Sequence, residues 1–131
     1  MVDLDFTKFG GLIPVIAQDY KTNEVLMMAF MNIESWELTV KTGYVHYWSR
    51  SRNCLWKKGE SSGNLQEVKE IRVDCDSDCI LIKINQIGGA ACHTGYRSCF
   101  YKKVKDDKIV ISGRKVFDPD EKYADVNGDV K

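Results

Sequence analysis

The sequence predicts a β-rich α+β domain, built from a small mixed sheet and one main helix. Three observations predict it: short segments rich in β-branched and aromatic residues, one segment with helix-capping residues at both ends, and turn residues between them. The length of 131 residues is that of one domain. We expect this domain to occupy residues 1–117, followed by a polar C-terminal tail at 118–131.

The first expected elements are two paired strands. Residues 12–18 are apolar and include Pro14, which predicts an edge strand because proline cannot donate to a sheet ladder. Residues 19–23 are typical of a turn. Residues 25–30 should therefore pair back on the first strand as a hairpin.

A helix and a third strand should follow. Asn32 can cap a helix that runs to about Thr42, and Gly43 can end it. Three apolar residues would line one face of this helix: Ile33, Trp36 and Val40. Residues 44–48 are aromatic and β-branched, which favours a strand.

The second half of the chain should begin with a long loop at residues 49–64, which is polar, basic and contains glycine. Such loops often bind ligands. Alternating and apolar patterns then predict further strands at residues 68–73, 80–84, 99–104 and 108–111. The last two should form a hairpin.

Composition excludes several classes of protein. There are 19 basic and 19 acidic residues, so net charge gives no general attraction to nucleic acid or to an anionic membrane. No apolar run is long enough to span a bilayer, and the N-terminus lacks the pattern of a secretion signal. We therefore expect a cytoplasmic location, with no membrane or nucleic-acid partner.

Five cysteines decide the candidate chemistry. Their odd number, without a secretion signal, argues against a disulfide framework. Reduced thiols are then either buried small hydrophobic residues or metal ligands. Both possibilities are open for Cys54, Cys75, Cys79, Cys92 and Cys99.

Three aspartates alternate with other residues at Asp74, Asp76 and Asp78. If a strand continues through them, the carboxylates share one face and Cys75 points away. Like charges on one face repel, and a hard cation such as Mg²⁺ or Ca²⁺ relieves that repulsion. A polar turn between two strands is the simpler alternative. An EF-hand loop is excluded, because its positions 6 and 12 would be Cys79 and Asn85.

A second cluster places Cys92, His93 and Cys99 within eight residues. A straight helix would separate the two cysteine Cα atoms by about 10.5 Å, so a loop that folds back at Gly95 suits a shared zinc better. A third thiol from Cys75 would complete a site with an open coordination position. His93 could be a ligand, a hydrogen-bonded loop residue or a proton carrier, and its place beside such a site favours proton transfer.

Basic side chains alternate with Trp48 and Trp56 in the long loop. An ordinary solvated surface would explain them equally well. The functional alternative is phosphate binding, since arginine binds phosphate bidentately and glycine lets the backbone approach a ligand. The candidates are Arg50, Arg52, Lys57 and Lys58, with Gly59 and Gly63 beside them.

Together these segments resemble the phosphoribosyl-AMP cyclohydrolases of histidine biosynthesis, in their monofunctional form. The similarity covers about residues 9–104. The segments that carry it are Trp48–Arg52, Lys58–Asn64, Asp74–Asp78 and Cys92–Phe100.

The resemblance implies a hydrolase that opens the adenine ring of N1-(5-phosphoribosyl)-AMP between N1 and C6, the third step of histidine biosynthesis. It implies Mg²⁺ on Asp74, Asp76 and Asp78, and one Zn²⁺ per subunit on Cys75, Cys92 and Cys99. It also implies an intertwined homodimer in which the two chains share the zinc site.

Roles for the other residues follow from this chemistry. Zinc-activated water would attack C6, and His93 would move the proton. Glu60 would contact ribose or orient water. The substrate carries two phosphates, which suit Arg50, Arg52 and Lys58. Ser62, Asn64 and Arg97 lie in the matching segments and should also contact the substrate.

Two other classes fit less well. Zinc nucleobase deaminases carry H-x-E followed by P-C-x-x-C, and neither pattern occurs in this chain. A structural zinc module that binds a protein or RNA is the non-enzymatic alternative, and zero net charge weakens its RNA form.

Overall fold

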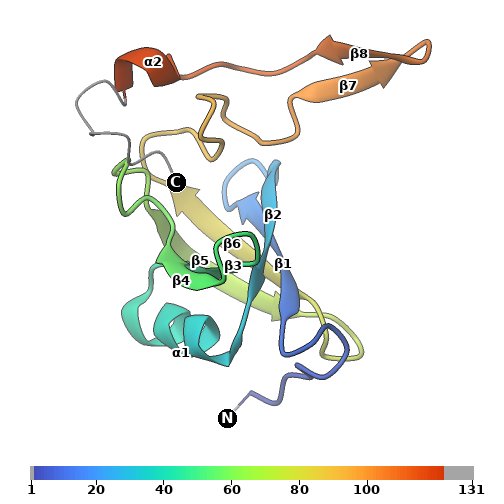
Figure 1. The fold of residues 1–131 in the computed structure, drawn as a ribbon, viewed down its shortest axis with the longest axis vertical. Coiled ribbons are helices and arrows are strands. Elements are labelled where there is room, and N and C mark those ends of the chain that lie inside the picture. The colour runs from blue at the N-terminus through green and yellow to red at the C-terminus, as the bar shows by residue number, and fades with distance from the viewer. Residues whose placement is uncertain (1, 123–131) are drawn as a thin grey trace.

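A six-stranded mixed sheet organises the computed structural model, which describes residues 2–122 (Figure 1). Its strands are β1 (Ile13–Asp19), β2 (Val25–Met31), β3 (His46–Ser49), β4 (Cys54–Lys57), β5 (Gln66–Val73) and β6 (Ile80–Gln86). They lie in the order β4-β3-β2-β1-β6-β5. Only the β1–β6 pair is parallel. The predicted β-rich α+β class is confirmed.

Strand β1 lies in the middle of the sheet, so the prediction that Pro14 marks an edge strand was wrong. It pairs with β2 on one side and with β6 on the other. Its ladder to β6 begins at Val15, one residue after Pro14. The proline therefore lies ahead of that ladder, where its missing N–H interrupts no bond to β6.

The hydrophobic core gathers around this central pair. Alternate residues of β1 and β6 are fully buried, as expected when successive side chains point to opposite faces. They pack with residues of β2 and β3, and the fully buried apolar side chains include Ile13, Val15, Leu26, Met31, Val45, Tyr47, Ile80, Ile82 and Ile84. Because β6 is buried in this core, the positions of its two ends are fixed relative to the sheet.

Helix α1 (Ile33–Thr42) has the predicted ends. Asn32 and Ser35 form a capping box, in which each side chain accepts a hydrogen bond from the other's backbone N–H. Gly43 ends the helix in the left-handed conformation, with φ of 79°.

The buried face of α1 agrees with the predicted one only at Trp36, which packs against the core. Ile33 and Val40 are 59% and 57% exposed, whereas Ser35 and Thr39 are fully buried. The Thr39 hydroxyl accepts a hydrogen bond from the His46 backbone N–H at 2.9 Å and donates to the Ser35 carbonyl at 2.8 Å. The helix therefore approaches β3 through hydrogen-bonded hydroxyls, which apolar periodicity alone does not indicate.

The predicted loop at residues 49–64 contains a strand. β4 pairs with β3 from His46↔Lys57 to Ser49↔Cys54, which leaves two shorter loops around it. The sheet also curls, because the start of β5 bonds to the chain ahead of β3. The Val45 N–H donates to the Gln66 carbonyl, and the Val68 N–H donates to the Gly43 carbonyl.

The predicted C-terminal hairpin is confirmed, although it begins at Lys102 rather than Cys99. It consists of β7 (Lys102–Lys105) and β8 (Lys108–Ile111), which form a separate two-stranded sheet. Figure 1 shows this hairpin extending away from the main sheet. All eight of its residues are exposed.

The chain continues into a short helix, α2 (Pro119–Lys122). Most of the predicted tail, residues 123–131, lies outside the described residues. Among the described helices, none is both long enough and apolar enough to cross a membrane.

A buried chain of hydrogen bonds links the core to the loop before β5. The Tyr47 hydroxyl donates to Gln66 Oε1 at 2.7 Å, and Gln66 Nε2 donates to Gln86 Oε1 at 2.9 Å. Gln86 Nε2 then donates to the Asn64 carbonyl at 2.9 Å. Burial raises the pKa of Tyr47, so its hydroxyl stays protonated and keeps donating.

The Tyr47 hydroxyl should therefore be needed for stability. Tyr47→Phe leaves Gln66 Oε1 buried without this donor, and we expect it to lower the free energy of unfolding by about 1–3 kcal/mol. Urea unfolding followed by circular dichroism measures the change. Tyr20→Phe, at a partly exposed position, is the matched control and should change stability by less than about 0.5 kcal/mol. Equal stabilities for the two variants would contradict the role given to the buried chain.

Candidate active site and metal centres

A pocket of about 410 Å³ brings together two stretches that are separate in sequence. One is β4 with the loop that follows it. The other is the loop after β6, represented by Ala91, Cys92 and His93. Of the residues predicted from sequence to form the site, this pocket is lined by Arg52, Lys58, Glu60, Ser62, Asn64, Cys92 and His93.

The loop after β6 folds back as predicted. The Ala91 N–H donates to the Arg97 carbonyl at 2.9 Å, and the Cys92 N–H donates to the Tyr96 carbonyl at 3.1 Å. Gly95 makes the reversal possible, since its φ is +97° and a Cβ there would lie 2.0 Å from the Phe117 carbonyl oxygen. We call residues 91–99, which carry Cys92 and Cys99, the thiol loop.

Exposure differs among the polar groups of this loop. Cys92 is buried, and its Sγ lies 2.9 Å from the Thr94 hydroxyl oxygen. His93 is exposed within the pocket, as is Glu60 across it. Cys99 is exposed, and its backbone N–H donates to the Leu26 carbonyl at 2.7 Å. Cys92 and His93 therefore lie where a bound ligand could reach them.

Lys58 joins the loop after β4 to the thiol loop. Its side chain is almost fully buried, and its ammonium group donates a hydrogen bond to the Ala91 carbonyl, one residue before Cys92. The same ammonium lies 5.7 Å from the centre of the Trp56 ring. Lys58 thus ties the loop after β4 to the residue before Cys92.

Two glycines allow the pocket wall to close around Asn64. A Cβ on Gly59 would lie 2.3 Å from the Asn64 carbonyl carbon, and a Cβ on Gly88 would lie 2.1 Å from Asn64 Oδ1. Both glycines also have positive φ. Asn64 is itself buried and receives the hydrogen bond from Gln86. The wall therefore depends on the buried hydrogen-bond chain of the core.

The segment Asp74–Asp78 is a turn, which is the simpler of the two alternatives that the sequence left open. β5 ends at Val73 and β6 begins at Ile80. Ser77 has a φ of 61°, and its N–H donates to the Asp74 carbonyl at 3.1 Å. This left-handed residue reverses the chain between the strands.

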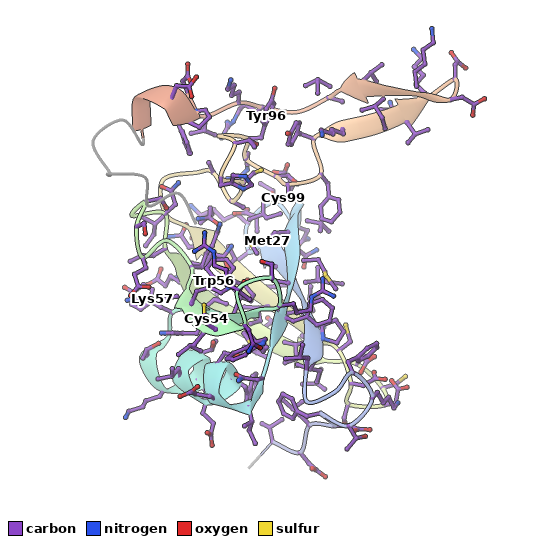
Figure 2. All side chains as sticks on the ribbon, in the orientation of Figure 1. Met27, Cys54, Trp56, Lys57, Tyr96 and Cys99 are labelled. Carbon is purple, nitrogen blue, oxygen red and sulfur yellow. The ribbon has the colours of Figure 1, made fainter. Side chains whose placement is uncertain are left out.

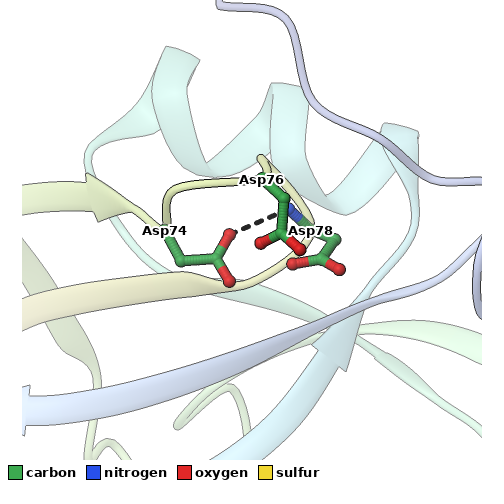
Figure 3. A group of neighbouring side chains, drawn as sticks. All are labelled: Asp74, Asp76 and Asp78. Carbon is green, nitrogen blue, oxygen red and sulfur yellow. Dashed lines mark hydrogen bonds between the residues drawn. The ribbon is translucent and has the colours of Figure 1, made fainter.

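The three carboxylates nevertheless converge. One oxygen from each of Asp74, Asp76 and Asp78 lies within 4.8 Å of the others (Figure 3). Asp74 Oδ1 accepts hydrogen bonds from the backbone N–H groups of Asp78 and Cys79, at 3.0 and 3.2 Å. Oxygen donors grouped in this way suit a hard divalent cation.

Lys8 is a partner of this turn that sequence analysis missed. Its ammonium lies 2.8 Å from Asp78 and 3.5 Å from Asp76. Its hydrogen bond lowers the pKa of Asp78, whereas partial desolvation and the charges of Asp76 and Asp78 raise the pKa of Asp74. No local pattern could have indicated a contact between residues 70 positions apart.

Cys75 lies far from the other two predicted zinc ligands. It is exposed in the acidic turn, directly before β6, whereas the thiol loop follows β6. Seven residues of strand at about 3.3 Å per residue place the two ends of β6 about 20 Å apart. Figure 1 shows the β5–β6 turn at the lower right, and Figure 2 labels Cys99 at the opposite end of the sheet.

Two of the predicted substrate-binding arginines lie outside the 410 Å³ pocket. Arg50 lines an adjoining pocket of about 590 Å³, and its guanidinium lies 4.0 Å from the centre of the Phe30 ring. Arg52 and Trp56 line both pockets. Arg97 lines neither, and its guanidinium contacts Asp19, Glu24 and the Gly89 carbonyl.

Comparison with known proteins identifies the family of this chain. The family model of phosphoribosyl-AMP cyclohydrolase matches residues 27–101. A curated phosphoribosyl-AMP cyclohydrolase from Desulfatibacillum aliphaticivorans is 65% identical over 123 residues, which cover 94% of this chain and 98% of the relative. Proteins of the same name from Desulforapulum autotrophicum and Methanococcoides burtonii are 58% and 60% identical, over 94% of this chain and 99% and 100% of theirs.

The chain is therefore a hydrolase. The chain is a member of the phosphoribosyl-AMP cyclohydrolase family.

The thiol loop has no room for a side chain at Gly95. In Gly95→Ala the new Cβ meets the Phe117 carbonyl, so the thiol loop should loosen and stability should fall by more than about 2 kcal/mol. Gly63→Ala is the matched control, because Gly63 also has positive φ but a Cβ there meets nothing within 4 Å. Its cost should be near 1 kcal/mol, from backbone strain alone. Thermal unfolding of both variants checks the difference, and equal costs would contradict it.

Proposed function

We propose that this chain hydrolyses the N1–C6 bond of the adenine ring in N1-(5-phosphoribosyl)-AMP, the third step of histidine biosynthesis. The observation that carries the proposal is the 410 Å³ pocket. It combines cationic, carboxylate and amide side chains with Cys92 and His93. Phosphate recognition and hydrolysis need these kinds of group at one place. Family membership supports the same reaction.

His93 and Glu60 are the proposed catalytic residues. Both are exposed in the pocket rather than held in the core, so both can contact a bound ring. A histidine titrates near neutral pH and can both accept and return a proton. We assign His93 to the proton transfer that accompanies addition at C6 and release of N1. We assign Glu60 to orienting water or the ribose hydroxyls.

The two phosphates are assigned to the basic groups of the two adjoining pockets. Arg52 lines both pockets, and Arg50 lines the larger one, where its guanidinium lies over the Phe30 ring. An ammonium has three N–H donors, so Lys58 can hold the Ala91 carbonyl and a phosphate oxygen together. Ser62 and Asn64 complete the proposed contacts from the pocket wall.

The donor groups fit two different metals. Thiolates at Cys75, Cys92 and Cys99 suit Zn²⁺, and the carboxylates of Asp74, Asp76 and Asp78 suit Mg²⁺. When bound, zinc would supply a Lewis acid that brings the pKa of a coordinated water to about 7. Lys8, whose ammonium forms ion pairs with Asp78 and Asp76, would compete with the second cation.

We further propose a homodimer in which each zinc takes Cys92 and Cys99 from one chain and Cys75 from the other. The separation of about 20 Å along β6 supports this, because three thiolates on one zinc must lie within about 4 Å of each other. The hairpin β7–β8 supports it too. A lone two-stranded hairpin is marginally stable in water, and its residues Val104, Ile109 and Ile111 are 58–71% exposed.

Ring opening can be measured directly. We expect the purified chain, supplied with Zn²⁺ and Mg²⁺, to change the ultraviolet absorbance of N1-(5-phosphoribosyl)-AMP as the purine ring opens. A chelator should abolish turnover, and added zinc should restore it. Cys92→Ser should be inactive, whereas Cys54→Ser should stay active, because Cys54 is not among the proposed ligands.

Two results would contradict the proposal. Absence of turnover with both metals present would exclude this reaction. Loss of the folded circular-dichroism spectrum on chelation, without any prior turnover, would favour a structural zinc module instead.

A further inference from the structure

Arg97 is held by three partners at one end of the sheet. Its Nη2 lies 3.0 Å from Asp19 Oδ1, its Nε donates to Glu24 Oε1 at 2.8 Å, and its Nη1 donates to the Gly89 carbonyl at 3.1 Å. The side chains of Arg97 and Asp19 are only 17% and 9% exposed. Arg97 lines neither of the two pockets described above.

We propose that Arg97 is a positioning residue for the thiol loop rather than a phosphate ligand. Its ion pairs with Asp19 and Glu24 would fix the spacing of Cys92 and Cys99 before any metal binds. The inference rests on the proposed function only in taking these two cysteines as zinc ligands.

The partners of Arg97 are themselves rigid. Asp19 ends β1 and Glu24 directly precedes β2, so the two carboxylates sit at either end of one tight turn. Asp19 Oδ2 accepts hydrogen bonds from the backbone N–H groups of Lys21 and Thr22 and from the Thr22 hydroxyl. The Asp19 N–H donates to the Glu24 carbonyl at 2.8 Å. Arg97 is therefore attached to the central hairpin of the sheet.

The guanidinium also connects the segment that enters the thiol loop with the segment that leaves it. Gly89 lies ahead of Cys92, and Arg97 lies two residues before Cys99, so one side chain bridges the entry and the exit of the loop. The next residues continue along β2. The Ser98 hydroxyl donates to the Val25 carbonyl at 2.8 Å, and the Cys99 N–H donates to the Leu26 carbonyl.

A phosphate would have to compete with these carboxylates for the charge of Arg97. The guanidinium uses three of its five N–H donors on Glu24, Gly89 and Asp19, and two of these partners are anions. Breaking a largely buried ion pair leaves an uncompensated charge, which is strongly unfavourable. A phosphate that displaced Asp19 would leave it in that state.

Two variants separate the roles, Arg97→Gln and Asp19→Asn. If Arg97 positions the loop, both should speed hydrogen exchange at the Ala91, Cys92 and Gly95 amides of metal-free protein by at least about tenfold. Both should also weaken zinc binding by about 10–100-fold, measured by competition with a chromogenic chelator. Exchange at Ile82, in the middle of β6, should stay slow and shows that each variant is folded. Arg72→Gln, at an exposed ion pair with Glu70, is the matched control.

The KM for the substrate, measured in both variants, can contradict the positioning role of Arg97. If Arg97 binds phosphate, Arg97→Gln should raise KM at least tenfold with zinc affinity and loop exchange unchanged, and Asp19→Asn should not raise KM. That outcome would overturn the inference. Faster loop exchange in both variants with unchanged zinc affinity would support the Arg97 contact and contradict the assignment of Cys92 and Cys99 to zinc.

Discussion

The position of β6 between β1 and β5 is the constraint on which the rest of this structure depends. A strand bonded on both sides and buried on alternate residues cannot bend far, so its two ends stay about 20 Å apart. One end carries the acidic turn with Cys75, and the other end leads into the thiol loop. The donors proposed for zinc therefore cannot meet within one chain. We propose that a second chain supplies the third thiol, and the exposed side chains of Val104, Ile109 and Ile111 on β7–β8 offer apolar surface for it.

The same sheet also sets the shape of the pocket. Tyr47, Gln66 and Gln86 carry hydrogen bonds from the core to the Asn64 carbonyl, and Gly59 and Gly88 let the backbone close around Asn64. Tyr47, Gln66, Gln86 and Asn64 are buried, so an unmade hydrogen bond among them would be costly and the arrangement has few alternatives. Polar groups in the core are thus the means by which the fold holds a solvent-facing wall in place.

Local patterns were sufficient for much of the fold. Asn32 and Gly43 marked both ends of α1, and the turn residues after Asp19 marked the first hairpin. The acidic cluster was also evident from sequence, although its backbone is a turn rather than a strand. These features depend on neighbours within a few residues.

Features that depend on distant partners could not be predicted from local patterns. Pro14 suggested an edge strand, but the parallel pairing of β1 with β6 joins segments about 65 residues apart. The contacts of Lys8 with the acidic turn and of Arg97 with Asp19 and Glu24 likewise cross most of the chain. The sequence predicted that Arg97 contacts the substrate, because it lies within a family motif. Only the folded structure shows that its guanidinium contacts two carboxylates.

The claim that two chains complete one site can be tested by subunit complementation. Inactive Cys75→Ser and Cys92→Ser proteins are mixed under conditions that exchange chains, and ring opening is measured. A shared site predicts recovery of about a quarter of wild-type activity, since random exchange makes half of the dimers mixed and each mixed dimer has one intact site. Cys92→Ser mixed with Cys99→Ser should recover nothing, because both changes fall in the same loop. No recovery in the first mixture, with chain exchange shown by mass spectrometry, would contradict the account.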